Sequence, residues 1–132
     1  MLPGYRSNRN VVFKCTYHVV WCPKYRRSVL TPPFDSVLKV LIKRLAKAMN
    51  VEVVEMEVMP DHVHLLLDVD PQFGIHRVVK RLKGATSHEL RRRYPQLRSR
   101  LPTLWTNAYF CATTGGAPRS VIKQYIENQK NV

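Results

Sequence analysis

Acidic residues are scarce in this chain of 132 residues, where 9 Asp and Glu stand against 22 Lys and Arg and give a formal net charge of +13. Such a surplus indicates a polyanionic partner or surface. Charge alone does not separate DNA, RNA and an anionic membrane, and it also fits basic side chains that only solvate helices. Six of the 9 acids fall between residues 51 and 70, which hold no Lys or Arg. A locally acidic pocket there could attract a metal cation.

Long hydrophobic runs are also missing. No apolar stretch approaches the ~20 residues of a membrane helix, and the first six residues lack the apolar segment of a signal peptide. We therefore expect a cytoplasmic protein with no membrane partner. The three cysteines, Cys15, Cys22 and Cys111, are odd in number and form no Cys-x-x-Cys pair, which argues against both a disulfide framework and a thiolate zinc site. We expect reduced, partly buried thiols.

The length and the 45% hydrophobic content fit a single domain spanning residues 1–132, with one core and no internal repeat. Apolar periodicity predicts strands over 11–21, 51–59 and 62–67, helices over 34–49 and 75–93, a last strand over 108–114 and a terminal helix over about 118–130. On the second strand we expect Val54, Met56 and Val58 on one face and Glu55 and Glu57 on the other. Arg98 and Arg100 are expected in a loop, and residues 115–117 are the most flexible point expected in the chain.

The order β-α-β-β-α-β with a further helix predicts an α+β fold of the ferredoxin-like, split-βαβ type. In this fold an antiparallel sheet is covered on one face by helices. The other face is left free for a site.

The strand that begins at His62 carries two histidines with one residue between them, His62 and His64. Successive side chains of a strand alternate between faces and rise ~3.3 Å per residue, so the two imidazoles share a face ~6.6 Å apart. Val63, Leu65 and Leu67 take the opposite face, and their burial fixes the register. Neutral imidazoles aimed at one point suit a divalent metal. The simpler alternative is an exposed face with two unconnected histidines.

Two basic segments are candidates for nucleic-acid contact. The first is the turn after Pro23, in which an aromatic among three cations could stack on a base: Lys24, Tyr25, Arg26 and Arg27. The second is the basic face of the helix after residue 75, with Lys80, Arg81 and Lys83. An ordinary solvated turn fits the first segment equally well. His18, His76 and His88 have no assigned role and are taken as structural or exposed.

Tyr125 and Gln129 lie four residues apart in the terminal helix and are therefore neighbours on one helical face. Taken alone, the pair fits a packed aromatic and a polar residue at a frayed helix end. Its meaning changes beside the other motifs of the chain, which are Tyr17 to Arg26 (YHVVWCPKYR), Met59 to Leu66 (MPDHVHLL), Val79 to Ala85 (VKRLKGA), Leu104-Trp105 and Tyr125 to Gln129 (YIENQ).

Together these motifs resemble the single-tyrosine HUH transposases, the TnpA type of small insertion sequences that move as single-stranded DNA, within a superfamily that includes the transposases associated with repetitive palindromes. The resemblance implies an RRM-like fold and a DNA transposase that cleaves and rejoins single strands, with DNA hairpins at the ends of an insertion sequence as partners. It implies Tyr125 as the nucleophile, and His62, His64 and Gln129 as ligands of Mg²⁺ or Mn²⁺. It further implies a homodimer in which the tyrosine helix of one subunit can complete the site of the other, with residues 115–117 as the hinge of that helix.

Two alternatives stay open at this stage. The same fold and charge suit a non-catalytic module that binds single-stranded nucleic acid, with the histidines incidental. A hydrolytic metal nuclease would use a metal-bound water and would leave free 5′-phosphate ends in place of a protein adduct.

Overall fold

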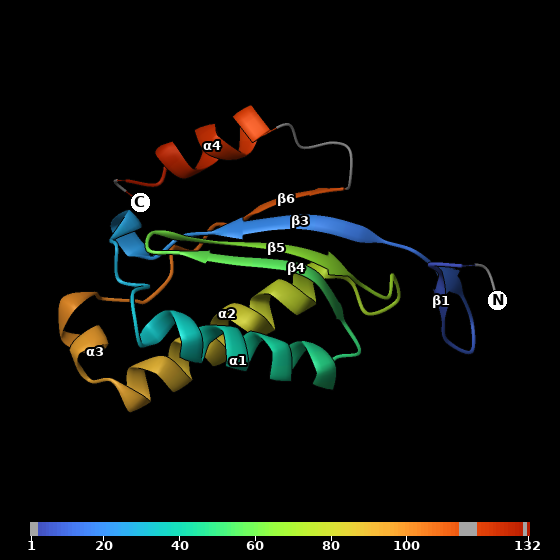
Figure 1. Cartoon of the computed structure of the whole chain (residues 1–132), viewed down its shortest axis with the longest axis horizontal. Helices are drawn as coiled ribbons and strands as arrows, with labels where there is room; N and C mark the ends of the chain where they lie inside the picture. Colours follow the sequence, from blue (N-terminus) through green and yellow to red (C-terminus); the bar gives the residue numbers. More distant parts are fainter. Residues whose placement is uncertain (1–2, 114–118, 131) are drawn as a thin grey trace.

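The computed structural model describes residues 3–113, 119–130 and 132. A four-stranded antiparallel sheet in the order β4-β5-β3-β6 forms its centre, and a two-stranded hairpin, β1-β2, extends from one end (Figure 1). The elements in chain order are β1 (Arg6–Ser7), β2 (Val12–Phe13), β3 (Thr16–Trp21), the 3₁₀ turn η1 (Lys24–Arg26), α1 (Phe34–Ala48), β4 (Glu52–Met59), β5 (His62–Asp68), α2 (Ile75–Arg93), α3 (Gln96–Arg100), β6 (Phe110–Thr113) and α4 (Arg119–Glu127).

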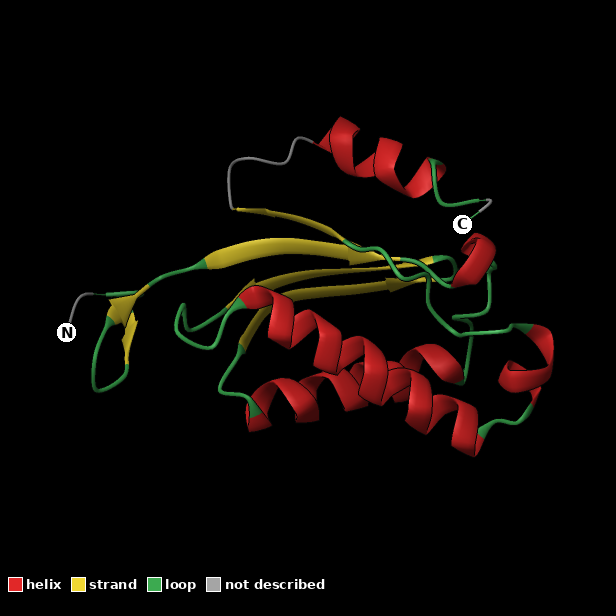
Figure 2. Cartoon of the chain, turned by 180° about the vertical axis from the view of Figure 1, so that it is seen from behind, coloured by secondary structure: helices red, strands yellow, loops and turns green. Residues whose placement is uncertain are grey.

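The sheet is a middle layer between two unequal helical layers. Helices α1 and α2 cover one face, and α4 lies over the other, as the views from both sides show (Figures 1 and 2). The strand order is that of a split-βαβ sheet, so the α+β fold predicted from the sequence is confirmed. The face expected to be free is instead partly covered by the chain's own terminal helix.

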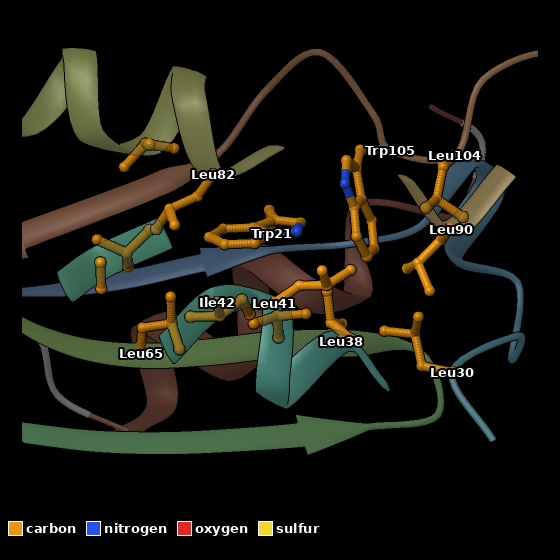
Figure 3. Packing of buried hydrophobic residues seen from close by; sticks show 14 of the residues in the cluster. Trp21, Leu30, Leu38, Leu41, Ile42, Leu65, Leu82, Leu90, Leu104 and Trp105 are labelled. Atoms are coloured by element: carbon orange, nitrogen blue, oxygen red, sulfur yellow. The ribbon is translucent and has the colours of Figure 1, made fainter. Parts of the chain in front are cut away.

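The core lies between the sheet and the α1-α2 layer. Helix α1 buries residues at intervals of three and four, and Figure 3 shows Leu38, Leu41 and Ile42 of this helix beside Leu65 of β5. Val63 and Leu67 of β5 belong to the same core. Trp21 and Trp105 pack edge to face with ring centroids 5.9 Å apart. Each fully buried leucine of this kind stabilises the fold by ~1.5–3 kcal/mol through removal of apolar surface from water. This core fixes which face of β5 points away from it.

The expected strand over 11–21 is interrupted at residues 14 and 15, because the backbone there is hydrogen-bonded to the side chain of Asp68 at the end of β5. The Cys15 backbone N–H donates to Asp68 Oδ1 at 3.0 Å, and Arg6 Nε donates to Asp68 Oδ2 at the same distance. The carboxylate, only 4% exposed, thereby ties the β1-β2 hairpin to the sheet. Only Thr16–Trp21 of the predicted segment belongs to the main sheet.

Three further expectations are corrected. Val54 does not share a face with Met56 and Val58, because a register shift between Val53 and Glu55 leaves Val54 47% exposed and puts Val53 against the core. Arg98 and Arg100 lie in the short helix α3, not in a loop.

The three cysteines are free thiols that differ in exposure. Cys111, on the edge strand β6, is exposed, whereas Cys15 is partly buried and Cys22 is buried. The hinge predicted at residues 115–117 and the helix start at Pro118 lie outside the described residues.

Candidate functional site

The β4-β5 hairpin presents the two histidines. Its turn, Pro60-Asp61, leads directly into β5, where Val63, Leu65 and Leu67 are fully buried on the core side. His62 and His64 alternate with them and point to the opposite face, partly exposed. Backbone pairing sets His64 opposite Glu57 and His62 opposite Met59. The shared orientation predicted from the sequence is therefore present.

His62 is oriented by the turn that precedes it. Its Nδ1 lies 2.9 Å from Asp61 Oδ1, so the ring donates its Nδ1 proton to the carboxylate, and Nε2 is the ring nitrogen left for another ligand. Arg26 Nε pairs with the other carboxylate oxygen, Asp61 Oδ2, at 3.3 Å. An imidazole held in this way by a carboxylate is the usual second-sphere arrangement of a metal-binding histidine.

His64 has a different partner, His18 of β3. His18 Nδ1 and His64 Nε2 lie 3.2 Å apart, so one of these nitrogens carries the proton and the other accepts it. Burial, and then the neighbouring His18, lower the pKa of His64, which keeps this imidazole neutral at pH 7. His18 is the site residue that the sequence analysis missed. Its only signal was its place on the polar face of the first strand, and the register that brings it to His64 depends on long-range strand pairing.

A cavity of about 890 Å³ opens above these histidines, between the sheet and α4. The sheet contributes His18, His62 and His64 together with the carboxylates of Glu55 and Glu57. The helix contributes Arg119, Ile122, Lys123 and Ile126. The cavity thus combines three imidazole rings, two carboxylates that attract a cation, and two basic side chains that suit a phosphate.

Tyr125 of α4 lies to one side of this cavity. Its ring packs on Phe110 of β6 with centroids 5.6 Å apart. Phe110 and His64 both pair with Val20, so they stand two strand spacings apart, ~10 Å. The Tyr125 hydroxyl is buried and has no hydrogen-bond partner within the described part of the chain. Burial, and then the nearby Cys22, raise the pKa of Tyr125 to about 12, so the phenol is protonated at neutral pH. Tyr125 and the histidine pair are not brought into one cavity.

Gln129 lies just beyond α4, where the backbone hydrogen bonds tighten from the i−4 to the i−3 carbonyl. It is 7% exposed, and its side-chain oxygen is buried without a hydrogen-bond partner among the described residues. An unsatisfied buried oxygen of this kind is costly unless something binds it. Over residues 3–113, 119–130 and 132, no group of three or more His, Cys, Asp or Glu is arranged to hold a metal ion. The donor set of two imidazoles and one amide oxygen nevertheless fits a divalent cation chemically.

The basic turn contains two kinds of cation. Arg27 is exposed, and Lys24 lies 5.1 Å over the ring of the exposed Tyr25. Arg26 is only 17% exposed and is paired within the chain, with Asp61 and with Glu127, both at 3.3 Å. Lys24, Tyr25 and Arg27 therefore remain available to an external ligand, whereas Arg26 has an internal structural role.

The basic side chains of α2 likewise include exposed cations and one cation that is bonded within the chain. Lys80 and Arg81 are exposed. Lys83 is partly buried and donates to the carbonyl oxygens of Thr106, at 2.6 Å, and Ala108, at 3.0 Å, and burial lowers its pKa to about 8. Its ammonium group thus binds the segment before β6 to α2.

In the part of the chain that the structure describes, no helix is long and apolar enough to span a membrane.

Comparison with known proteins gives a consistent result. The model of the family described as "Transposase IS200 like" matches residues 11–129. The ISDra2 transposase TnpA of Deinococcus radiodurans is 41% identical over 126 residues, which cover 94% of this chain and 90% of that protein. The transposase for insertion sequence element IS200 of Salmonella typhimurium is 29% identical over 126 residues, covering 94% of this chain and 82% of that protein.

Two solved structures share the fold. The crystal structure of a protein from Deinococcus radiodurans R1, described as a transposase, superposes with a TM-score of 0.88 at 38% identity, over 96% of this chain and 99% of that one. A tyrosine transposase associated with REP sequences, solved bound to a REP hairpin, gives a TM-score of 0.59 at 14% identity, over 94% of this chain and 70% of that one, and this supports the fold alone. With its sheet, its paired histidines and its terminal helix, the chain belongs to the IS200-like transposase family.

Proposed function

We propose that this transposase cleaves and rejoins single-stranded DNA through a covalent intermediate on Tyr125. The phenol oxygen attacks the scissile phosphorus and forms a 5′-phosphotyrosine. The departing 3′ oxygen takes a proton and becomes a free 3′-OH. A different 3′-OH later attacks the same phosphorus, releases the tyrosine and reseals the strand, so the energy of the phosphodiester bond is kept.

The observation that supports this proposal best is the pair of imidazoles of His62 and His64, which face one cavity with the tyrosine-bearing helix as its roof. We propose these two residues and Gln129 as ligands of Mg²⁺ or Mn²⁺. A cation held there would polarise the phosphate oxygens and offset the charge that develops on them. The lowered pKa of His64, the hydrogen bond that orients the His62 ring and the unpartnered Gln129 oxygen support this assignment. Arg119 and Lys123 are placed to neutralise the phosphate from the opposite wall of the cavity.

The phenol has to reach the phosphate held at that site. In the described arrangement it is buried against Phe110 and protonated, so α4 must move before the attack. We propose that α4 either shifts across its own sheet or docks on the sheet of a second copy in a homodimer. The REP-associated relative is described as bound to a hairpin, and we propose DNA hairpins as partners here too. The candidates for contact with the strand are the exposed Tyr25, Arg27, Lys80 and Arg81 and the partly exposed Lys24.

The test is the reaction of wild-type protein and Tyr125→Phe with end-labelled single-stranded DNA and Mg²⁺. We expect the wild type to nick the strand and retain a covalently linked fragment, while Tyr125→Phe binds the same DNA with unchanged affinity and forms no adduct. A fully active Tyr125→Phe variant would refute the nucleophile assignment. Nicking with free 5′-phosphate ends would indicate a hydrolytic nuclease, and binding without any nicking would indicate a non-catalytic module.

A further inference from the structure

The 3₁₀ turn η1 has an unusual backbone. Tyr25 and Arg26 follow one another with φ of 59° and 51°, the left-handed region that non-glycine residues rarely adopt. Strain of this kind persists only where the surroundings enforce it. The first two residues of the turn are bonded to distant parts of the chain, because the Lys24 N–H donates to the Leu104 carbonyl and the Tyr25 N–H to the Val132 carbonyl, each at 2.9 Å. The Arg26 side chain that follows is only 17% exposed.

Arg26 contacts the histidine hairpin on one side. Its Nε pairs with Asp61 Oδ2 at 3.3 Å, and the other oxygen of the same carboxylate accepts the proton of His62 Nδ1 at 2.9 Å. Asp61 is therefore fixed between a guanidinium and an imidazole. The position of Arg26 helps to set the plane in which the His62 ring stands.

Arg26 contacts the tyrosine helix on the other side. Its Nη1 pairs with Glu127 Oε1 at 3.3 Å and donates to the Ile126 carbonyl at 3.4 Å. Ile126 and Glu127 directly follow Tyr125 in α4. A guanidinium can serve both sides at once because its donors diverge in one rigid plane, which the single ammonium of a lysine cannot reproduce.

We propose that Arg26 is a positioning residue that couples the orientation of His62 to the seating of the tyrosine helix on its own sheet. While the Arg26 contacts hold, α4 is kept in the arrangement in which Tyr125 is buried. The helix is released when Arg26 gives up Glu127 and the Ile126 carbonyl. The part of this inference that concerns metal affinity rests on the proposed function, whereas the coupling of Asp61 to α4 does not.

The coupling is tested by amide hydrogen exchange of α4, residues 121–127, in full-length protein without metal. Within the described residues Asp61 forms its hydrogen bond and ion pair with His62 and Arg26 and none with α4, yet Asp61→Asn should speed this exchange by roughly twofold, because Arg26 loses the carboxylate that fixes it. Arg26→Ala should speed it by about tenfold, since all contacts with Glu127 and Ile126 are lost. In the Arg26→Ala background, Asp61→Asn should have no further effect on the exchange of α4. Additive effects in this cycle would overturn the coupling.

The same variants are then titrated with Mn²⁺ by calorimetry. Arg26→Ala should weaken Mn²⁺ binding by about tenfold although it removes no proposed ligand, because Asp61 and the His62 ring lose their support. Arg26→Lys should keep at most one of the two measured quantities, the exchange rate of α4 or the affinity for Mn²⁺, at the wild-type value. Arg27→Ala, which removes the same charge from the exposed neighbouring residue, is the matched control and should leave both readouts at the wild-type value.

The outcomes separate the two hypotheses. If the wild type binds no Mn²⁺ while the exchange cycle is non-additive, the proposed metal site fails and the Arg26 coupling stands. If Mn²⁺ binds but Arg26→Ala affects only one of the two readouts, the coupling fails and the metal site stands. If Arg26→Ala does not fold, as judged by its urea midpoint, Arg26→Lys and Glu127→Gln take its place in the exchange cycle. A wild-type exchange rate of α4 in both variants would overturn the proposal.

Discussion

The two histidines of β5 differ in their immediate surroundings. His62 donates its Nδ1 proton to the Asp61 carboxylate. His64 lies within hydrogen-bond distance of His18, and burial lowers the pKa of His64. A divalent cation requires both imidazoles in their neutral form with a lone pair directed at it. Asp61 orients the His62 ring and burial lowers the pKa of His64, so loss of either histidine is expected to disrupt the site.

His64→Ala should lower the affinity for Mn²⁺ by at least about tenfold, because it removes a proposed ligand and not only a supporting group. Isothermal titration calorimetry measures this directly. His88→Ala, on the outer face of α2 and exposed, is the matched control and should bind Mn²⁺ as the wild type does. Equal affinities of the His64 and His88 variants would contradict the ligand assignment.

At this scale the sequence predicted the residues whose orientation depends on local periodicity alone. The alternation of β5 was sufficient to place His62 and His64 on one face and Val63, Leu65 and Leu67 on the other. His18 was missed, because its approach to His64 depends on how β3 and β5 pair across 46 residues of sequence. Val54 was misplaced, because a single extra residue in β4 reverses the alternation and leaves little mark on the sequence.

At the scale of secondary-structure elements, the register of β5 decides whether a site exists. A slip of one residue would bury the histidines and expose the leucines. What prevents this slip is the packing of the three fully buried side chains of β5 against α1 and α2. The stability of the core and the presentation of the site are therefore linked through one strand.

Leu65→Ala should destabilise the protein by ~2–5 kcal/mol, since it leaves a cavity at a fully buried position. Leu66→Ala, the next residue on the site face and partly exposed, should cost less than half as much. Urea denaturation followed by circular dichroism gives both values. A larger loss for Leu66 than for Leu65 would mean that the strand faces the other way.

The helices and strands were largely predictable, since α1, β4, β5, α2 and β6 follow clear periodic patterns with proline and glycine at their ends. The β1-β2 hairpin was not predicted, because its contacts with the sheet, above all those of Arg6 with Asp68 and of Asn8 with Asp70, join residues 62 positions apart in sequence. The place of α4 was not predictable either. Its amphipathic pattern indicates that one face is covered, and it does not say which surface covers it.

At the scale of the whole molecule, the pH dependence of folding reflects groups that the fold buries. Burial, and then the nearby Asp61, raise the pKa of Cys22 to about 12 from an ordinary value of 9.0. The folded protein thus keeps this proton over a range in which the unfolded chain has lost it. The contribution of the Cys22 thiol to the free energy of unfolding is therefore fully present below pH 9 and is lost as the pH rises toward 12.

The free energy of unfolding should therefore fall between pH 9 and 12, and it should fall less steeply in Cys22→Ala. Urea denaturation at several pH values in this range measures the two slopes. Cys111→Ala, at an exposed position, serves as the control and should follow the wild-type slope more closely. If wild type and Cys22→Ala show identical slopes, the buried thiol does not contribute as described.

The net charge of +13 also acts at the scale of the whole molecule. If the exposed cations of the basic turn and of α2 neutralise phosphates, the logarithm of the affinity for single-stranded DNA should fall linearly with that of the salt concentration, by ~0.7 per contact. Fluorescence anisotropy over a salt series gives this slope. Replacing both Lys80 and Arg81 by Ala should reduce it by about one to two contacts, and an affinity insensitive to salt would argue against this surface.

The most direct test of the central claim is to locate the covalent bond between protein and DNA. The wild-type protein is incubated with single-stranded DNA and Mg²⁺, digested, and its peptides are analysed by mass spectrometry. We expect a nucleotide adduct on the peptide that contains Tyr125, absent when the metal is chelated or when Tyr125 is replaced by Phe. An adduct on any other residue, or cleavage that leaves only free 5′-phosphate ends, would contradict it.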